Sequence, residues 1–202
     1  LIHTGVRKAL CFVKIDTDSG IHGWGECYTQ SDRDLQIVAH VDQLKRYLIG
    51  RDPTNIKHFM QVAYDDFASR RGAMDLYCAL SGIEQALWDI MGKRLGAPVH
   101  TLLGGACRDR VRVYANGWSN GAESTEHPGA LERQARKVVE KGFTALKFDP
   151  IPGPWRTFVD KDLMRKAVDN VRVVREAVGP DVDMMVETHR RLAPMHAIRL
   201  AR

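Results

Sequence analysis

The chain has 202 residues, of which 44% are hydrophobic and 27% are charged, proportions typical of a soluble globular protein. These proportions argue against a disordered or collagen-like chain. The formal net charge is +5, but Lys and Arg are scattered among Asp and Glu without a long basic run. We therefore expect no nucleic-acid binding, and a small anionic substrate suits the charge equally well.

Apolar runs are short along the whole chain. None approaches the roughly 20 residues that cross a bilayer, and residues 1–20 lack the apolar stretch of a signal peptide. We therefore expect a cytoplasmic protein with no membrane partner. The four cysteines form no C-x-x-C pair, which indicates reduced thiols rather than a zinc site or a disulfide framework.

The first half of the chain mixes strand and helix patterns. Apolar alternation on both sides of a turn-forming cluster predicts a β-hairpin over residues 8–26. A period of 3.6 then predicts helices over residues 35–48 and 56–67, with Pro53 in the first turn of the second helix. A longer helix is predicted over residues 76–95, ended by Gly96. Together these elements predict an α+β domain over residues 1–110.

From residue 111 onward, strand patterns alternate with helix patterns. Strands are predicted over residues 111–117, 144–149 and 182–188, and helices over 128–141, over 161–178 and from 193 onward. This order implies a parallel sheet, either open and doubly wound or closed as a (β/α)8 barrel. No G-x-G-x-x-G follows the first strand, so the dinucleotide-binding open sheet has no support.

The barrel alternative limits what residues 111–202 can contain. A barrel needs about 250 residues, so this region would hold only about its first three βα units. We therefore expect the chain to be truncated after the third barrel strand.

One long stretch resembles a known family. ALSGIEQALWDIMGKRLGAPVHTLLGG, at residues 79–105, is similar to the helix and linker of the mandelate racemase and muconate lactonizing enzyme branch of the enolase superfamily. GIHGWGE, KGFTALKFDP and MMVETH extend the resemblance over essentially the whole chain. The resemblance implies an α+β capping domain over a TIM barrel, Mg²⁺ at the carboxyl ends of the barrel strands, and a homo-oligomer. Within this branch the chain resembles sugar-acid dehydratases of the galactonate and gluconate type.

Lys147 and Asp149 lie near the end of the second predicted barrel strand. Their spacing places both on one side of the strand and Phe148 on the other. In the family the matching pattern is K-x-K, in which the first lysine stabilises the substrate carboxylate and the second is a base. This chain keeps the first as Lys147 and has Asp149 in the second position, so a lysine base is absent from this face.

Glu187 and His189 have the same spacing at the end of the third predicted strand. The resemblance implies that Glu187 is a metal ligand, and a carboxylate is the hard oxygen donor that Mg²⁺ prefers. It also implies that His189 protonates a departing hydroxyl, a role that suits an imidazole titrating near neutral pH.

Other candidates fall where the capping loops and the first barrel strand of the family meet the substrate. An arginine there can hold a carboxylate in a bidentate way, although most surface arginines are simply solvated. These substrate-binding candidates are Trp24, Tyr28, Arg33, Arg70, Asn116 and Trp118.

The leading hypothesis is a Mg²⁺-dependent dehydration of a sugar acid. A base removes the proton next to the carboxylate, Lys147 and the metal stabilise the resulting enediolate, and His189 protonates the leaving hydroxyl. Racemisation needs bases on both faces of the carbon, so Asp149 in place of lysine favours dehydration. A racemase, epimerase or cycloisomerase in which Asp149 has a base-like role stays open. So does an inactive fragment or non-enzymatic binding module, if the translated product has only these 202 residues.

Overall fold

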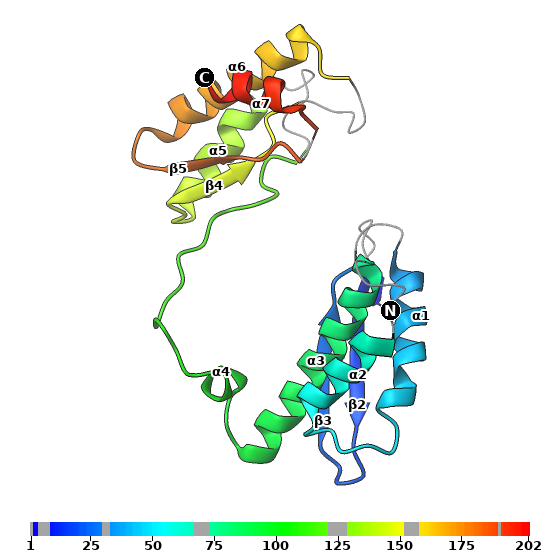
Figure 1. The fold of residues 1–202 in the computed structure, drawn as a ribbon. Coiled ribbons are helices and arrows are strands. Elements are labelled where there is room, and N and C mark those ends of the chain that lie inside the picture. The colour runs from blue at the N-terminus through cyan, green and yellow to red at the C-terminus, as the bar shows by residue number, and fades with distance from the viewer. Residues whose placement is uncertain are drawn as a thin grey trace. The chain divides into compact units, whose positions relative to one another are not determined.

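The computed structural model describes residues 2–3, 9–29, 33–66, 73–120, 129–151, 158–189 and 191–202. The chain divides into two compact units, Leu1–Asp109 and Arg110–Arg202 (Figure 1). Among the described helices, none combines the length and the apolar character that crossing a bilayer would take.

The first unit contains a three-stranded antiparallel sheet in the order β1-β2-β3. Its strands are β1 (Ile2–His3), β2 (Ala9–Asp16) and β3 (His22–Cys27). β2 and β3 pair from Cys11 opposite Cys27 to Asp16 opposite His22. The hairpin predicted from apolar alternation is therefore confirmed.

Helices α1 (Asp34–Leu44), α2 (Ile56–Asp66), α3 (Met74–Leu95) and α4 (Val99–Leu102) complete this unit. The helix predicted over residues 35–48 ends earlier, because a 3₁₀ turn, η1 (Lys45–Tyr47), follows α1. The prediction for Pro53 was wrong, since α2 begins only at Ile56. The Asp52 carboxylate accepts hydrogen bonds from the Thr54 N–H at 2.9 Å and hydroxyl at 2.8 Å, which keeps Pro53 in a turn ahead of the helix.

Helix α3 packs directly on β3, and glycines make the close approach possible. A Cβ built on Gly25 would overlap the carbonyl oxygen of Gly82, and one built on Gly23 would overlap that of Ala86. The alternate residues of β3, His22, Trp24 and Glu26, are exposed. The inward face of α3 carries apolar side chains, and Trp88 is half-buried against the same core.

The second unit alternates helices and strands. Its elements are α5 (Ala130–Glu140), β4 (Ala145–Phe148), α6 (Lys161–Val178), β5 (Asp183–Val186) and α7 (Pro194–Ala201). β4 and β5 pair in parallel, with Ala145 opposite Asp183 and Phe148 opposite Val186. The predicted parallel pairing of these two strands is confirmed, and closure into a barrel stays a prediction.

The strand predicted over residues 111–117 was wrong. This segment forms one isolated parallel bridge, in which Ala115 lies opposite Leu146. Ala115 is buried, but Val111 and Val113 are 73% and 61% exposed. An alternating pattern forms a strand only where a neighbouring surface buries one of its faces, and here only Ala115 has such a neighbour.

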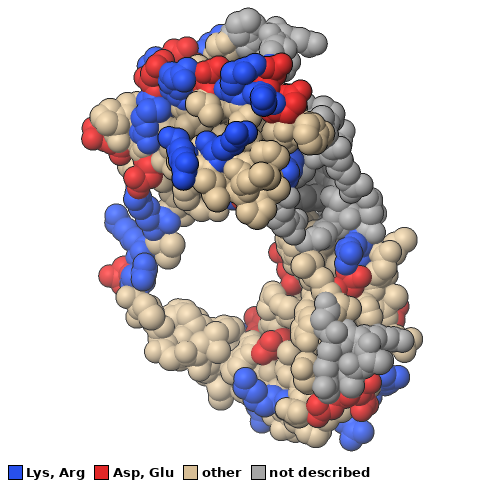
Figure 2. Space-filling model, turned by 45° about the horizontal axis from the view of Figure 1, so that its top comes forward, with Lys and Arg blue, Asp and Glu red and all other residues tan. Residues whose placement is uncertain are grey.

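Charged side chains of both signs are interspersed over the visible surface of each unit (Figure 2). On α5, for example, Arg136 lies 3.0 Å from Glu132, and on α6 Arg172 lies 2.6 Å from Asp169. Exposed helix pairs of this kind contribute about 0.3–0.5 kcal/mol each.

Candidate functional site

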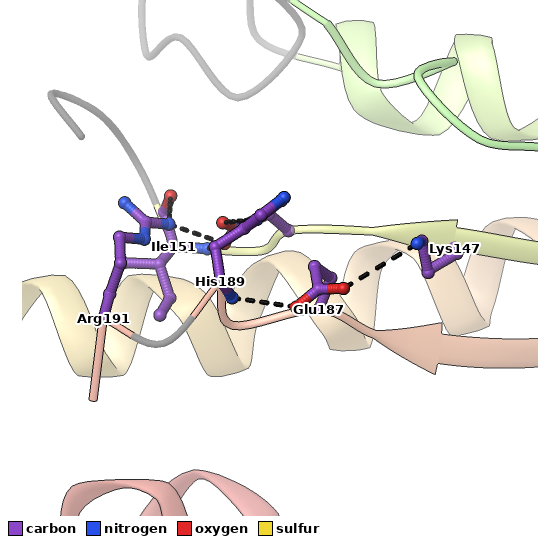
Figure 3. A network of polar contacts seen from close by, with 6 residues as sticks. Lys147, Ile151, Glu187, His189 and Arg191 are labelled. Atoms are coloured by element: carbon purple, nitrogen blue, oxygen red, sulfur yellow. Dashed lines mark hydrogen bonds and ion pairs between the residues drawn. The ribbon is translucent and has the colours of Figure 1, made fainter. Parts of the chain in front are cut away.

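The candidate site lies where β4 and β5 end. Because the strands are parallel, their carboxyl ends meet at one edge of the sheet, and the residues that follow them are neighbours (Figure 3). The Glu187 N–H donates to the Phe148 carbonyl at 2.9 Å, which continues the pairing one residue beyond β5. This edge therefore brings together Lys147, Asp149, Glu187 and His189.

Lys147 points away from the core, as its position in β4 predicted. Phe148 is 2% exposed and belongs to the apolar core of the unit. The Lys147 ammonium lies 3.7 Å from Glu187 Oε2 and 5.2 Å from the centroid of the Tyr114 ring. The ammonium is thus held between a carboxylate and an aromatic face, and its side chain is 24% exposed, so a ligand can still reach it.

Glu187 is an anion whose charge is stabilised locally. Its Oε1 accepts a hydrogen bond from the His189 backbone N–H at 2.9 Å. This bond first, and then the charges of His189 and Lys147, lower the pKa of Glu187 below its ordinary value. At neutral pH the site consequently contains a carboxylate, with its side chain 35% exposed, beside a lysine ammonium.

His189 lies in a tight turn after β5. Its φ is 46°, and among the residues that the structure describes it is the only one other than glycine with a positive φ. Its Nδ1 lies 3.0 Å from Asp149 Oδ2, and its side chain is 42% exposed. The imidazole is therefore tied to the strand next to its own.

Asp149 is a centre of hydrogen bonding rather than a free carboxylate. Its Oδ1 accepts from the Ile151 N–H at 2.9 Å and from the Arg191 guanidinium at 2.6 Å, while its Oδ2 faces His189. Arg191 also donates to the Ile151 carbonyl at 2.7 Å. Sequence reasoning missed Arg191, which lies 42 positions beyond Asp149 and carries no local pattern that would have indicated this contact.

The two candidates after the predicted first barrel strand differ in their surroundings. The Trp118 indole N–H donates to the Lys147 carbonyl at 3.0 Å, and its ring lies 5.4 Å from that of Phe148. These contacts give Trp118 a packing role beneath β4. Asn116 is exposed next to Ala115. Substrate binding by either residue stays a prediction.

The remaining candidates belong to the first unit. Trp24 and Tyr28 are 50% and 59% exposed. The Arg33 guanidinium donates to Asp75 at 2.9 Å, which gives it a structural partner at the start of α1 and α3. Arg70 lies outside the described residues. Substrate binding by these residues also stays a prediction.

Glu187 is the side chain of this site that suits a metal ion best. Glu187 supplies a hard, anionic oxygen, and Mg²⁺ binds through one or more carboxylates, usually keeping several waters. In the ranges that the structure describes, no three His, Cys, Asp or Glu residues gather into a metal-binding group. Asp149 is already engaged by Arg191 and His189. Glu187 thus fits Mg²⁺ as one ligand, while the described residues do not form a complete site.

Comparison with known families identifies the class of protein. Residues 2–104 match the mandelate racemase / muconate lactonizing enzyme N-terminal domain, and residues 130–202 match the enolase C-terminal domain-like family. The chain belongs to the mandelate racemase and muconate lactonizing enzyme family of the enolase superfamily. It has the N-terminal capping domain of that fold and part of the C-terminal barrel domain.

Individual relatives are similar over nearly the whole chain. A D-gluconate dehydratase from Thermoproteus tenax is 40% identical over 94% of this chain and 37% of its own length. A D-galactonate dehydratase from Xanthomonas euvesicatoria is 38% identical over 91% of this chain and 46% of its own length. The chain therefore spans less than half of these two curated relatives.

Solved structures agree with this assignment. A protein from Mesorhizobium loti, assigned as a dehydratase, superimposes with a TM-score of 0.87 at 37% identity, over 96% of this chain and 52% of that one. An enolase from Agrobacterium radiobacter, assigned as a galactarate dehydratase and solved with Na and L-malate bound, has a TM-score of 0.78 at 33% identity. It is matched over 95% of this chain and 47% of its own.

Proposed function

We propose that this protein takes part in the Mg²⁺-dependent dehydration of a sugar acid in the active site of a (β/α)8 barrel. The observation that carries the proposal is the cluster at the ends of β4 and β5, where Lys147 faces Glu187 and His189 is held beside them (Figure 3). The dehydratases among its relatives support the same reaction class.

The reaction is a β-elimination in which atoms balance. The bond between hydrogen and C2, the carbon next to the carboxylate, breaks and the proton passes to a base on the opposite face of the substrate. The bond between C3 and its hydroxyl oxygen then breaks, and His189 supplies the proton with which the hydroxyl leaves as water. The resulting enol becomes a 2-keto-3-deoxy acid when C3 takes a proton from solvent.

Lys147 and Glu187 have complementary roles in this proposal. The Lys147 ammonium stabilises the negative charge that develops on the substrate carboxylate as C2 loses its proton. Glu187 contributes one oxygen ligand to the metal. When bound, Mg²⁺ supplies Lewis-acid stabilisation of the same carboxylate.

Racemisation or epimerisation with Asp149 as base is less well supported by the geometry. Both oxygens of Asp149 face hydrogen-bond partners, and one of them is the guanidinium of Arg191. To take a proton from the substrate, Asp149 would have to give up one of these contacts. We therefore give Asp149 no part in proton abstraction.

The proposal is tested by turnover. The full translated product, identified by its intact mass, is incubated in D₂O with Mg²⁺ and with D-gluconate or D-galactonate, and the products are followed by NMR. We expect a 2-keto-3-deoxy acid carrying deuterium at C3. Deuterium exchange at C2 without loss of water would instead indicate a racemase or epimerase, and an intact product of only 202 residues without turnover would indicate an inactive or binding chain.

Variants separate the catalytic cluster from the rest of the chain. We expect His189→Gln to lower turnover by about 10²–10⁴-fold, the usual contribution of general acid catalysis. His58→Gln on α2, an exposed histidine of the other unit, is the matched control and should leave turnover unchanged. Equal turnover for both variants would remove His189 from the mechanism.

Two further features follow from family membership. We propose a small anionic substrate, because Lys147 offers a partly exposed positive charge at the site. We also propose a homo-oligomer, which multi-angle light scattering would test directly.

A further inference from the structure

Asp149 stands where the family pattern has its second lysine, and the structure gives it contacts that a base does not need. We propose that Arg191 and Asp149 are positioning residues, which hold the His189 imidazole with its hydrogen on Nδ1 and present Nε2 to the substrate. The function of this arrangement rests on the dehydration proposed above, whereas the arrangement itself can be tested without it.

The first step is that Arg191 immobilises Asp149. The Arg191 side chain is only 8% exposed, and its guanidinium donates both to Asp149 Oδ1 at 2.6 Å and to the Ile151 carbonyl at 2.7 Å. The Ile151 N–H donates to the same Oδ1 at 2.9 Å. One guanidinium nitrogen, Nη2, makes both bonds, and the burial of the side chain limits its movement, so the carboxylate that it contacts is held in orientation.

The second step is that Asp149 selects one tautomer of His189. With Oδ1 occupied, Oδ2 is the oxygen that lies 3.0 Å from Nδ1 of His189. A carboxylate can only accept hydrogen bonds, so the hydrogen of this contact belongs to Nδ1. The other ring nitrogen, Nε2, is then the one that meets the substrate. In the imidazolium form both ring nitrogens carry a hydrogen, so Nδ1–H stays on Asp149 and the hydrogen on Nε2 is the proton given to the leaving hydroxyl.

The third step is that hydrogen bonds also hold the backbone of His189 in one conformation. Its φ of 46° is a left-handed conformation that non-glycine residues rarely adopt. Two hydrogen bonds stabilise it, from the His189 N–H to Glu187 Oε1 at 2.9 Å and from the Arg191 N–H to the Thr188 carbonyl at 2.9 Å. Strained backbone of this kind persists where the surroundings hold it, and it is common at functional sites.

The arrangement gives Asp149 a use that is consistent with the loss of lysine at its position. A lysine ammonium donates hydrogen bonds and cannot accept one, so it could not hold an Nδ1–H imidazole. The pairing of Asp149 with His189 thus replaces a base on one face of the substrate by an oriented proton donor.

The direct test is the tautomer of His189 in the 202-residue chain. ¹⁵N-histidine NMR is recorded at a pH about two units above the ordinary imidazole pKa of about 6.5, and His189 is assigned by the signals that His189→Gln removes. We expect the Nδ1–H form in the unmodified chain and a change towards the Nε2–H form in Asp149→Ala. Asp169→Ala, which removes an exposed carboxylate paired with Arg172, is the control and should leave the His189 signals unchanged.

The His189 tautomer of the unmodified chain tests the positioning role even where a variant does not fold. A predominantly Nε2–H form of His189 in the unmodified chain would overturn the positioning role. So would an Nδ1–H form that persists in folded Asp149→Ala.

Kinetics then connect the arrangement to the reaction. In the full translated product with Mg²⁺ and D-gluconate, we expect Asp149→Ala to lower kcat by about 10²-fold and to change KM little. With 3-deoxy-3-fluoro-D-gluconate the loss should largely disappear, because fluoride departs without a proton. An equal loss on both substrates would contradict the positioning role, whereas an Nδ1–H tautomer in a protein that dehydrates no sugar acid would contradict the proposed function alone.

Discussion

Gly25 on β3 offers a sharp test of how the first unit is packed. A Cβ at this position would overlap the Gly82 carbonyl oxygen and lie 2.9 Å from both the Ala86 nitrogen and the Gln85 Cβ of α3. Two of these three atoms are backbone, so Gly25→Ala forces β3 and α3 apart. Overpacking of this kind costs up to about 3 kcal/mol.

The same substitution also has a smaller, stabilising effect on the free energy of unfolding. Replacing glycine by alanine in a strand gains about 0.5–1 kcal/mol from reduced backbone freedom. The net expected loss is therefore about 2 kcal/mol, which lowers Tm by roughly 8–16 °C for a unit of about this size. Thermal unfolding followed by far-UV circular dichroism measures this change.

The neighbouring position provides the matched control. Glu26 is exposed on the same strand, and its backbone bonds to Gln85 do not need its side chain. Glu26→Ala should change the free energy of unfolding by less than about 0.5 kcal/mol. A Tm of Gly25→Ala equal to or above that of the unmodified chain would refute the close packing of β3 on α3.

Three further predictions concern individual contacts. Burial alone would raise the pKa of Asp89, but hydrogen bonds from Lys93 and the Trp24 N–H lower it overall. The ionised Asp89 therefore stabilises the folded chain above about pH 4, and this stabilisation is lost as pH falls. The difference in urea midpoint between the unmodified chain and Asp89→Asn should accordingly shrink between neutral pH and pH about 3. Burial, followed by the neighbouring Cys11, raises the pKa of the Cys27 thiol to about 12. Iodoacetamide should therefore label the exposed Cys107 and spare Cys27 in the folded chain, as read by peptide mass spectrometry. Rapid labelling of Cys27 would contradict its burial. Trp118→Phe removes the hydrogen bond to the Lys147 carbonyl but keeps the ring against Phe148, so it should cost about 1 kcal/mol in chemical unfolding, and no loss would show that this bond contributes nothing.

Local periodicity predicted most of the elements and failed where a second segment decides the outcome. The hairpin of β2 and β3 and helices α3 and α6 follow from patterns within single segments. Residues 111–117 alternate in the same way but pair only at Ala115, because a strand also depends on a partner that its own residues do not specify. Pro53 was misplaced because the side chain of Asp52 stabilises a competing turn.

The candidate site was predictable to the extent that it depends on strand geometry. A spacing of two residues was enough to place Lys147 and Asp149 on one side of β4, opposite Phe148. The contacts of Asp149 were not predictable, because Arg191 reaches it across 42 positions only after β4 and β5 have paired. A role for Asp149 as a base, one of the alternatives open from the sequence, loses support for this reason.

The location of the metal tests the central claim most directly. Crystals of the full translated product grown with Mn²⁺ in place of Mg²⁺, together with D-gluconate, would reveal the ion by its anomalous scattering. We predict an ion ligated by the Glu187 carboxylate, with the Lys147 ammonium on the substrate carboxylate and His189 Nε2 at the 3-hydroxyl. An ion bound away from Glu187, or a substrate that contacts neither Lys147 nor His189, would contradict the account.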